Sequence, residues 1–444
     1  MRLLAQAFLR SCEEQGIALG GKTVLCALSG GRDSMALFHL CLKLGAEHGF
    51  AVAAAHYNHC LRETADRDEA FVRSFCEKKG VPLIVGRGDV AALAETEKTS
   101  VEDAARIMRY HFLEETADEL GADFIATAHH ADDNAETLLL HLLRGAGLQG
   151  LCGIPPVRGR IIRPLLSVDR AAINAYIAEN SIPFVEDETN GETVYERNRL
   201  RHELFPLLEE LSPGSTGRIA TAAERLRADH ACLERQAEEL LPLPSENGET
   251  ELSRSLLRSR DAAIAVRLVR LAARRFGIEL TAAQADSVLA LRTGAMLSLP
   301  DGVRAAAEKN IVRFYRVPTP PSPLSLRPGT QRWGEYIVSL SETDGEIESD
   351  ENVIALRGDV GELTIAAWNG IGRLTVDNGS RTVKRLLADH GIGAPRQENR
   401  PAIFSGCALI AVFGAGVDLG ARPFAGETKK VITLAKEDKR NNEK

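Results

Sequence analysis

The sequence predicts an α/β fold, with a parallel sheet covered by helices, then a helical domain, then a small α/β domain at the carboxyl end. Two observations support this prediction. Over the first two hundred residues, short apolar runs alternate with longer helical patterns, as in strands joined by crossover helices. A string rich in glycine and serine directly follows the first of these runs. Parallel sheets bind their ligands at that end of their strands.

Each expected strand is followed by an expected helix. The strands are placed at residues 22–28, 51–56, 81–85 and 123–128, and the helices at residues 34–47, 65–79, 100–120 and 132–144. The first strand is an apolar, β-branched run, which is typical of a strand buried on both faces. This alternation implies parallel pairing, so the carboxyl ends of the strands meet at one edge of the sheet.

The rest of the chain has a different pattern. From about Thr216 to Arg292 it predicts helices alone, with a leucine stripe at helical spacing. A proline-rich stretch from Val317 to Gly329 then predicts a linker. We therefore expect a first domain over residues 1–210, a mainly helical domain over 211–317, a linker over 318–329, a small α/β domain over 330–436 and a disordered tail over 437–444.

Composition excludes several classes of protein. The 444 residues contain eight cysteines without a C-x-x-C pair, which argues against a zinc ribbon, an iron–sulfur cluster or a disulfide framework and favours a reducing cytoplasm. No apolar run approaches the roughly 20 residues that span a bilayer, and the amino terminus lacks the apolar core of a signal peptide.

The net charge of −8 means that local basic patches would have to hold any nucleic acid. The two candidate patches lie at residues 194–202 and 381–400. Either run could instead be an ordinary solvated face.

One glycine-rich string is misleading. Gly16 to Thr23 fits G-x-x-x-x-G-K-[ST], the pattern of a Walker-type phosphate loop. That loop needs a strand before it and a helix after it, so that the helix amides face the phosphates. Here a helix precedes the string and the expected strand follows it, so we predict a tight turn from helix to strand.

The string from Ser29 to Ser34 has the order that a phosphate site requires. It leaves the first strand and opens a helix, and its two glycines allow the backbone to approach an anion closely. Serine hydroxyls and the free amides of the helix start can then hold phosphate oxygens. The alternative is an ordinary turn in which Asp33 or Ser34 caps the helix. This S-G-G-x-D-S string resembles the PP-loop of the ATP pyrophosphatases, which cleave ATP between its α and β phosphates.

Further strings are similar to one family within that superfamily, the tRNA(Ile)-lysidine synthetases. The first four strings are H-x-N-H-x-L-R from His56, E-x-x-A-R-x-x-R-Y from Glu102, A-H-H-x-D-D-x-x-E-T from Ala128 and R-G-x-G from Arg144. The later strings are I-R-P-L-L from Ile162, the segment from Glu186-Asp187 to Asn190, R-N-R-L-R-H from Arg197, and V-K-R-L-L from Val383, which is followed by Arg400-Pro401. The similarity is dense over residues 22–206, weaker in the helical middle, and returns near the carboxyl end. Cys60 departs from the pattern, because the family more often has glycine there.

Single strings also have ordinary explanations. Asp133 and Glu136 could cap their helix, and Glu102 and Arg106 are spaced for a helical ion pair. His129 and His130 lack the third spaced ligand that a zinc site needs. Capping alone does not explain why these strings all follow strands of one predicted sheet.

The resemblance implies an enzyme that joins lysine to C2 of the wobble cytidine of tRNA(Ile) with a CAU anticodon. ATP adenylates the C2 oxygen, pyrophosphate leaves, and the lysine ε-amine then displaces AMP. The first domain would bind ATP and carry out catalysis, and the two later domains would bind tRNA. The oligomeric state is left open, a homodimer included.

The resemblance also implies roles for particular residues. ATP would be bound by Ser29, Gly30, Gly31, Arg32, Asp33, Ser34, His56 and Asn58. Catalysis would use Asp33, Asp132, Asp133, Glu136, Arg106 and Arg109, with Asp33 as the expected Mg²⁺ or pyrophosphate contact. The carboxylates would hold the lysine cation or accept its proton. The tRNA would be bound by Arg197, Arg199, Arg201, Lys384 and Arg385.

Three alternatives remain. A PP-loop tRNA thiolase would deliver sulfur, which usually needs paired cysteines. An amidotransferase-type synthetase using ammonia would leave the later domains without an obvious role. A non-catalytic RNA-binding protein would bind RNA without ATP turnover.

Overall fold

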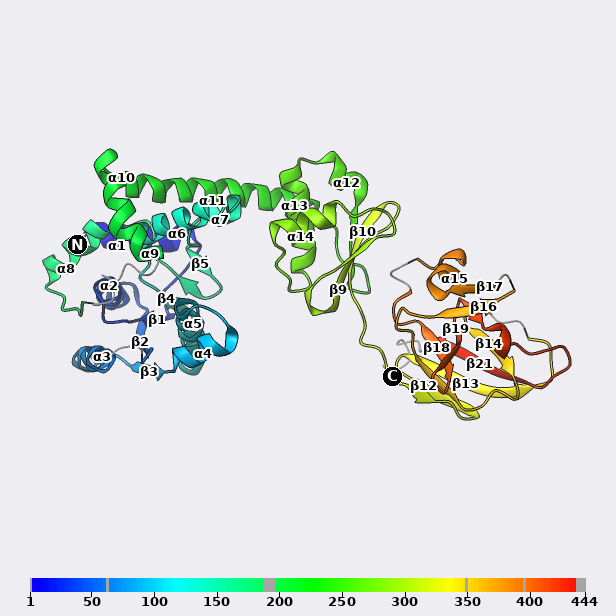
Figure 1. Ribbon diagram of the computed structural model, residues 1–444. Coiled ribbons are helices and arrows are strands. Elements are labelled where there is room, and N and C mark those ends of the chain that lie inside the picture. The colour runs from blue at the N-terminus through cyan, green and yellow to red at the C-terminus, as the bar shows by residue number, and fades with distance from the viewer. Residues whose placement is uncertain are drawn as a thin grey trace. The chain divides into compact units, whose positions relative to one another are not determined.

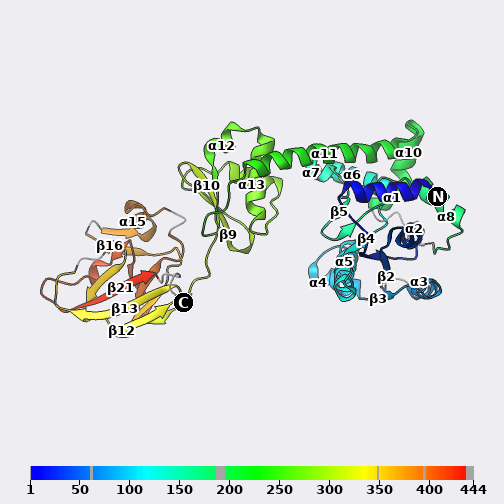
Figure 2. The same ribbon diagram turned by 180° about the vertical axis from the view of Figure 1, so that it is seen from behind.

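The computed structural model describes residues 2–60, 64–186, 196–347, 350–377, 379–393 and 397–436. It divides into two compact units, residues 1–232 and 233–444, each described by itself below (Figures 1 and 2). The predicted five-part division of the chain stays a prediction. Leu61 and Arg62, the segment from Asp187 to Tyr195, Arg396 and the tail over 437–444 lie outside the described residues.

The first unit contains the predicted parallel sheet. Its strand order is β3-β2-β1-β4-β6-β5, and every pair is parallel except the edge pair β5–β6. The strands are β1 (Thr23–Ala27), β2 (Ala51–Asn58), β3 (Leu83–Arg87), β4 (Phe124–Ala126), β5 (Val157–Arg158) and β6 (Ile161–Ile162). The four predicted strands are confirmed within about two residues, and β1 lies at the centre, where the chain switches sides.

Helices cover both faces of this sheet (Figure 1). Val24 and Cys26 of β1 pack on one face with α1 (Arg2–Glu14), α2 (Arg32–His48), α3 (Ala65–Lys79) and α8 (Arg170–Asn180). Leu25 faces the other side and packs with α5 (Val101–Leu120). Since neighbouring strand residues alternate between two apolar layers, β1 is apolar throughout, as the sequence predicted.

The remaining helices of this unit lie around the sheet or extend the chain. They are α4 (Val90–Glu97), α6 (Ala131–Leu143), α7 (Leu148–Leu151), α9 (Glu196–Arg199), the π-helical turn η2 (Leu200–Leu204), α10 (Phe205–Leu211) and α11 (Ser215–Leu240), whose residues from Leu233 onward belong to the second unit. The Walker-like string forms the predicted turn between α1 and β1, where Gly16 and Gly21 adopt φ values of 65° and 72°. No helix among the described residues is long and apolar enough to cross a membrane.

The second unit begins with a helix and sheet region. Helices α12 (Arg254–Ser259), α13 (Ala262–Arg274) and α14 (Ala282–Leu289) pack with a sheet of order β7-β10-β9-β8. Its strands are β7 (Thr250–Ser253), β8 (Met296–Ser298), β9 (Val303–Ala307) and β10 (Ile311–Arg316). The prediction of helices alone between residues 216 and 292 is therefore wrong at β7. Thr250 and Leu252 alternate into the core there, and the strand pairs antiparallel with β10, a partner that local periodicity cannot show.

The remainder of the second unit is rich in strands. One sheet has the order β11-β15-β18-β19-β20, a second has the order β12-β13-β21-β14, and β16 pairs with β17. The first comprises β11 (Leu324–Ser325), β15 (Leu363–Ala367), β18 (Pro401–Ser405), β19 (Ala408–Val412) and β20 (Gly416–Val417). The others comprise β12 (Gly329–Trp333), β13 (Tyr336–Thr343), β14 (Val353–Arg357), β21 (Lys429–Lys436), β16 (Arg373–Val376) and β17 (Gly379–Thr382). Helix α15 (Val383–Asp389) packs in an apolar cluster with Leu374 and Val412. Strand β11 lies inside the stretch that was predicted to be a linker.

Candidate active site

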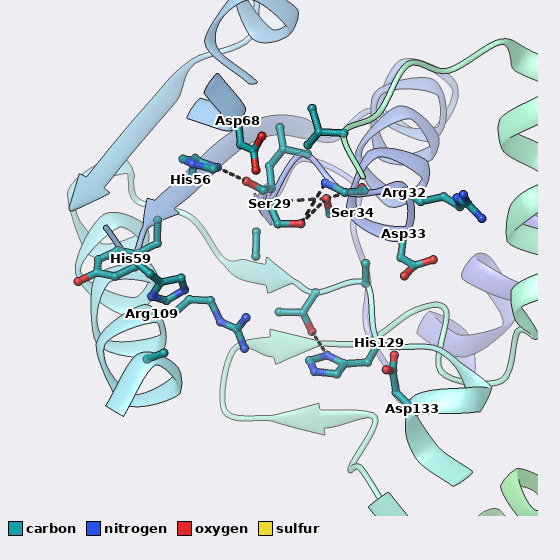
Figure 3. Close-up of a pocket in the computed structure, with 18 of the residues that line it drawn as sticks. Ser29, Arg32, Asp33, Ser34, His56, His59, Asp68, Arg109, His129 and Asp133 are labelled. Atoms are coloured by element: carbon teal, nitrogen blue, oxygen red, sulfur yellow. Dashed lines mark hydrogen bonds between the residues drawn. The ribbon is translucent and has the colours of Figure 1, made fainter. Parts of the chain in front are cut away.

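A cavity of about 1060 Å³ opens at the carboxyl ends of β1, β2 and β4. Its walls come from the loops after these three strands, from α5 and α6, and from residues 184–186 and 197–201 (Figure 3). The cavity reaches the upper end of the range found for small-molecule sites, so a nucleotide and a second substrate group fit within it. The sheet edge predicted to bind ligand is therefore hollow.

The loop after β1 is shaped for close approach by an anion. Gly30 has φ of 88°, and a Cβ added there would lie 3.1 Å from side-chain atoms of both Val185 and Val72. Ser29 Oγ lies 2.9 Å from Ser34 Oγ, and it also accepts the Gly31 N–H at 3.3 Å. These contacts fix the turn, and the amides at the start of α2 lie directly after it (Figure 3).

The ordinary capping explanation for this loop does not hold. Gly31 occupies the position before α2, and no side chain caps the helix there. The Asp33 side chain instead points into the cavity (Figure 3), and its buried Oδ1 has no hydrogen-bond partner among the described residues. A buried carboxylate oxygen without a partner is costly unless a ligand satisfies it. The geometry therefore suits a cation or a donor group between Asp33 and a bound phosphate.

His130 links this loop to the start of α6. The ring is buried, with Nε2 3.6 Å from Asp33 Oδ2 and 3.4 Å from Asp133 Oδ2, while Nδ1 lies 3.7 Å from Asp132 Oδ1. Burial opposes a positive charge on the ring, but the three carboxylates outweigh it and raise the pKa of His130 to about 10. His130 is therefore a cation at neutral pH, and it holds two loops of the cavity together.

His129, the next residue, has the opposite character. Burial lowers the pKa of His129 to about 3, and the positive charges of Arg163, Arg109 and Arg106 act in the same direction. The ring faces the cavity, and its Nδ1 lies 2.9 Å from Thr127 Oγ1 (Figure 3). Adjacent histidines thus present a neutral hydrogen-bonding ring to the cavity and a charged ring to the carboxylates behind it.

Asp132 and Asp133 remain ionised beside His130. Burial raises the pKa of each carboxyl, but the His130 charge outweighs this and lowers both pKa values below the usual range. Asp133 also accepts the His130 backbone N–H at 3.0 Å, so it caps α6 as the ordinary explanation predicted. No cluster of three or more metal-ligating side chains occurs within the described ranges.

Glu136 is more buried than Asp132 and Asp133, and both of its carboxylate oxygens accept hydrogen bonds. It is 2% exposed, and its oxygens accept the Arg201 guanidinium at 2.7 and 3.0 Å and the Arg197 Nε at 3.1 Å. Two arginines predicted to contact tRNA therefore hold α9 and η2 against α6. Arg199 instead pairs with Glu203 at 3.3 Å on the surface.

The arginines of α5 have no helical ion pair. Arg109 lines the cavity, and burial lowers its pKa. Arg106 packs over the Tyr110 ring, with its guanidinium carbon 5.3 Å from the ring centroid. No ion pair forms between Glu102 and Arg106, both of which lie in the described part of α5. The ordinary explanation for this spacing is therefore wrong.

The two residues of β2 predicted to bind nucleotide, His56 and Asn58, both line the cavity. Nδ1 of His56 lies 2.8 Å from the Leu28 carbonyl oxygen. The Asn58 amide donates to Asp66 and Glu69, both at 3.1 Å, and accepts the Cys60 N–H at 2.9 Å, so it shapes the turn. Cys60 adopts φ of 53°, so the turn that the family usually builds with glycine is retained.

Arg32 has several partners beside the cavity. Its guanidinium donates to Asn174 at 3.0 Å and to Glu186 at 3.4 Å, and lies 4.7 Å from the Phe184 ring centroid. These contacts hold residues 184–186 beside the loop after β1. They suggest positioning of the loop in addition to the predicted contact with ATP.

Lys384 and Arg385 belong to the second unit and are exposed on α15. The nearby Arg381 is neutralised by Asp389 at 2.5 Å. No ion pair joins Lys384 or Arg385 to a carboxylate within the described ranges, so both cations face solvent. This is the arrangement expected of a patch for a polyanion.

Sequence reasoning missed three contributors to the site. The sequence pattern assigns His129 and His130 no role beyond an incomplete zinc motif, and it does not indicate Arg170. Arg170 lines the cavity, and its guanidinium lies 3.3 Å from His130 Nε2. Two adjacent histidines beside two aspartates could have indicated a charged cluster, but no local pattern indicates Arg170.

Comparison with known proteins agrees with the cavity's location. The PP-loop domain family matches residues 4–208. The tRNA(Ile)-lysidine synthase of Geobacter sulfurreducens is 34% identical over 446 residues, covering 94% of each chain. That of Petrotoga mobilis is 44% identical over 190 residues, covering 43% of this chain and 61% of the relative. Among solved structures, the U34-tRNA thiolase NcsA of Methanococcus maripaludis is similar at 18% identity and a TM-score of 0.43, covering 51% of this chain and 79% of that one.

Proposed function

Because the chain belongs to the tRNA(Ile)-lysidine synthase family, we propose that it is an ATP-dependent ligase that joins lysine to the wobble cytidine of tRNA(Ile) with a CAU anticodon. One observation supports this proposal most directly. The S-G-G-x-D-S loop and the ionised Asp133 face the same cavity, with His130 between Asp33 and Asp133, while Asp132 lies at the other ring nitrogen of His130. A site for phosphate therefore adjoins a site for a cationic amine.

The chemistry requires both sites. The C2 carbonyl of cytosine is a poor electrophile, and its oxygen is a poor leaving group. Transfer of AMP from ATP to that oxygen releases pyrophosphate and makes C2 reactive. The lysine ε-amine then bonds to C2, the C2–O bond breaks, and AMP leaves with the oxygen.

The phosphate loop and Arg109 would hold the nucleotide. The amides at the start of α2 can donate to phosphate oxygens, and the glycines of the loop leave room for them. Arg109 lines the opposite wall, where a guanidinium can stabilise charge that develops on the transferred phosphoryl group. His56 would border the nucleotide from β2.

The unpartnered Oδ1 of Asp33 fits a magnesium site. Mg²⁺ is commonly bound through one or two carboxylates together with substrate phosphates and water, so a cage of three protein ligands is not required. When bound, the ion would neutralise phosphate charge. Asp33 would hold it beside the loop.

Asp132 and Asp133 would receive the lysine. The free ε-amine has a pKa of about 10.4, so it arrives protonated and must lose a proton before attack. Asp133, which lines the cavity and stays ionised, can hold the ammonium, and the ionised Asp132 on the other side of His130 adds negative charge nearby. Glu136, occupied by Arg197 and Arg201, would hold α9 and η2 in position, so its predicted catalytic role would be indirect.

RNA binding would be divided between the two units. The target base must leave its stack to reach the cavity. Lys384 and Arg385 would bind phosphates elsewhere on the tRNA, and Arg199 would bind phosphates nearer the cavity. Because tRNA, ATP and free lysine meet in the cytoplasm, we place the reaction there. A homodimer stays a prediction that the mass in solution would test.

Pyrophosphate release tests the proposed reaction. We expect ATP to yield AMP and pyrophosphate only when unmodified tRNA(Ile) is present. A transcript with cytidine replaced by uridine at the wobble position serves as the matched control. Equal release with both transcripts would contradict adenylation of the wobble cytidine.

A further inference from the structure

Four arginines surround the ring of Tyr110. The guanidinium carbons of Arg106, Arg109 and Arg158 lie 5.3, 5.5 and 4.6 Å from the ring centroid. Arg163 donates from Nη2 to the Tyr110 hydroxyl at 3.4 Å. Tyr110 itself is buried between α5 and the sheet, in one apolar layer with Ile125 and Ile161. The ring is therefore a fixed base on which cations from α5 and from the β5–β6 hairpin converge.

No carboxylate balances these charges. Within the described residues, none of the four guanidiniums forms an ion pair with Asp or Glu, whereas Arg160 in the same hairpin pairs with Glu114 at 3.0 Å and Asp118 at 2.7 Å. Arg163 is 1% exposed, and its Nε is buried without a hydrogen-bond partner among the described residues. Like charges held this close repel, and burial strengthens the repulsion. Such a cluster is complementary to an anion.

The cluster extends beyond the nucleotide cavity. Arg109 lines the cavity, but Arg106 and Arg158 do not line it, and both are exposed. Arg158 belongs to β5, the edge strand of the sheet. A nucleotide bound at the Ser29 loop would occupy the cavity itself, so it would leave the outer arginines without a partner. A polyanion that runs from the rim into the cavity would contact them all except the buried Arg163.

We propose that the arginine cluster on Tyr110 is a phosphate-binding subsite for the RNA strand that carries the target base. This inference rests on the proposed function. Backbone phosphates beside the target nucleotide would bind Arg106 and Arg158 at the rim, next to Arg109, which faces the nucleotide in the cavity. Arg163 is a positioning residue, because it holds the Tyr110 hydroxyl and lies too deep to reach the ligand.

The electrostatics of Tyr110 agree with this assignment. Burial raises the pKa of the phenol, but the Arg163 hydrogen bond and the charges of Arg163, Arg106 and Arg109 outweigh it and lower the pKa below its ordinary value. The local field therefore favours negative charge at this point. A phosphodiester is ionised at every physiological pH, so its negative charge would always be stabilised by these arginines.

Arg158→Ala and Arg160→Ala form a matched pair that tests the subsite. Both variants remove one positive charge from the same hairpin, but only Arg160 is already neutralised by carboxylates. The measurement is the Kd of the full chain for an anticodon stem–loop RNA over a range of salt concentrations. We expect Arg158→Ala to raise the Kd at least fivefold at low salt and to lower the salt slope by about 0.7 to 0.9. Arg160→Ala should stay within about twofold of wild type.

Further measurements distinguish the RNA backbone from the nucleotide as the anion that the arginine cluster binds. The Kd for a non-hydrolysable ATP analogue, measured without RNA, should be unchanged in Arg158→Ala. Arg158→Lys, which keeps the charge, should recover most of the RNA affinity. Equal RNA affinity in Arg158→Ala and Arg160→Ala would overturn the proposal. The proposal would also be overturned if Arg158→Ala lost as much affinity for the ATP analogue as for RNA. The anion at the cluster would then be the polyphosphate of the nucleotide. Neither binding measurement requires turnover, so a failure of lysine transfer by the wild-type chain would contradict the proposed function alone.

Discussion

Nε2 of His130 lies 3.6 Å from Oδ2 of Asp33, and this contact joins the loop after β1 to the start of α6. The same ring lies within 3.7 Å of Asp132 and Asp133. One buried cation thus lies close to three carboxylates, and it keeps Asp132 and Asp133 ionised. In the proposed reaction, this arrangement would let the site present negative charge to a lysine or a magnesium ion without driving the two loops apart.

Replacing His130 should change how stability depends on pH. Because the pKa of the folded state, about 10, lies above the ordinary value of 6.5, the charged ring stabilises the fold fully below about pH 6.5. That contribution declines as the pH rises and is lost as the pH passes through 10. The free energy of unfolding of wild type relative to His130→Gln should therefore fall by on the order of 5 kcal/mol across this window. Chemical denaturation without ATP or magnesium measures it, and a constant difference would contradict a charged His130.

Gly30 should be required for nucleotide binding as well as for stability. An alanine there meets both an unfavourable φ and two valine side chains at 3.1 Å, so it should displace the phosphate loop. We expect at least a tenfold loss of ATP affinity in Gly30→Ala, measured by calorimetry. Gly80→Ala is the matched control, since its φ is 66° but no atom lies within 4 Å of the added Cβ. That variant should lose about 1 kcal/mol of stability and keep its ATP affinity. Equal ATP affinity in both variants would refute a nucleotide site at this loop.

Glu136→Gln should loosen the segment of α9 and η2. The substitution removes a buried carboxylate and leaves Arg197 and Arg201 without their counter-charge, which costs about 3 kcal/mol in comparable buried pairs. Thermal unfolding of the full chain measures this loss. Glu203→Gln, which breaks only the exposed pair with Arg199, should change stability by less than about 1 kcal/mol. Similar small changes in both variants would show that Glu136 does not hold the segment.

The exposed cations of α15 should affect tRNA and not ATP. Lys384→Glu combined with Arg385→Glu reverses two charges on a helix whose apolar face stays buried, so the fold should persist. We expect the KM for tRNA to rise at least tenfold while the Kd for an ATP analogue is unchanged. Lys309→Glu combined with Arg292→Glu, which also reverses two exposed charges, controls for net charge. An equal rise in KM for the control would indicate a general charge effect.

Much of the fold follows from local patterns, whereas the site depends on tertiary partners. The alternation of apolar runs and helices located β1 to β4, and the glycine string located the loop between β1 and α2. Helix α4 was not predicted, although Asp89 caps it by accepting the Ala92 N–H at 3.1 Å. Strand β7 was hidden because its pairing partner β10 lies far along the chain.

The arginine string at 197–201 shows the limit most clearly. Its charges indicated a surface for RNA, but the structure turns Arg197 and Arg201 onto Glu136. The arginines and Glu136 are far apart in the sequence, and no local sequence pattern indicates that they form an ion pair. Likewise, the pKa values of His129 and His130 diverge because of groups from three separate segments.

Incorporation of radiolabelled lysine into unmodified tRNA(Ile) with a CAU anticodon tests the central claim most directly. We predict labelling by the wild-type chain that requires ATP and is abolished in Asp33→Ala, while tRNA affinity in that variant is retained. Absence of labelling in the wild type, with ATP still cleaved to AMP and pyrophosphate when the tRNA is added, would contradict lysine as the nucleophile.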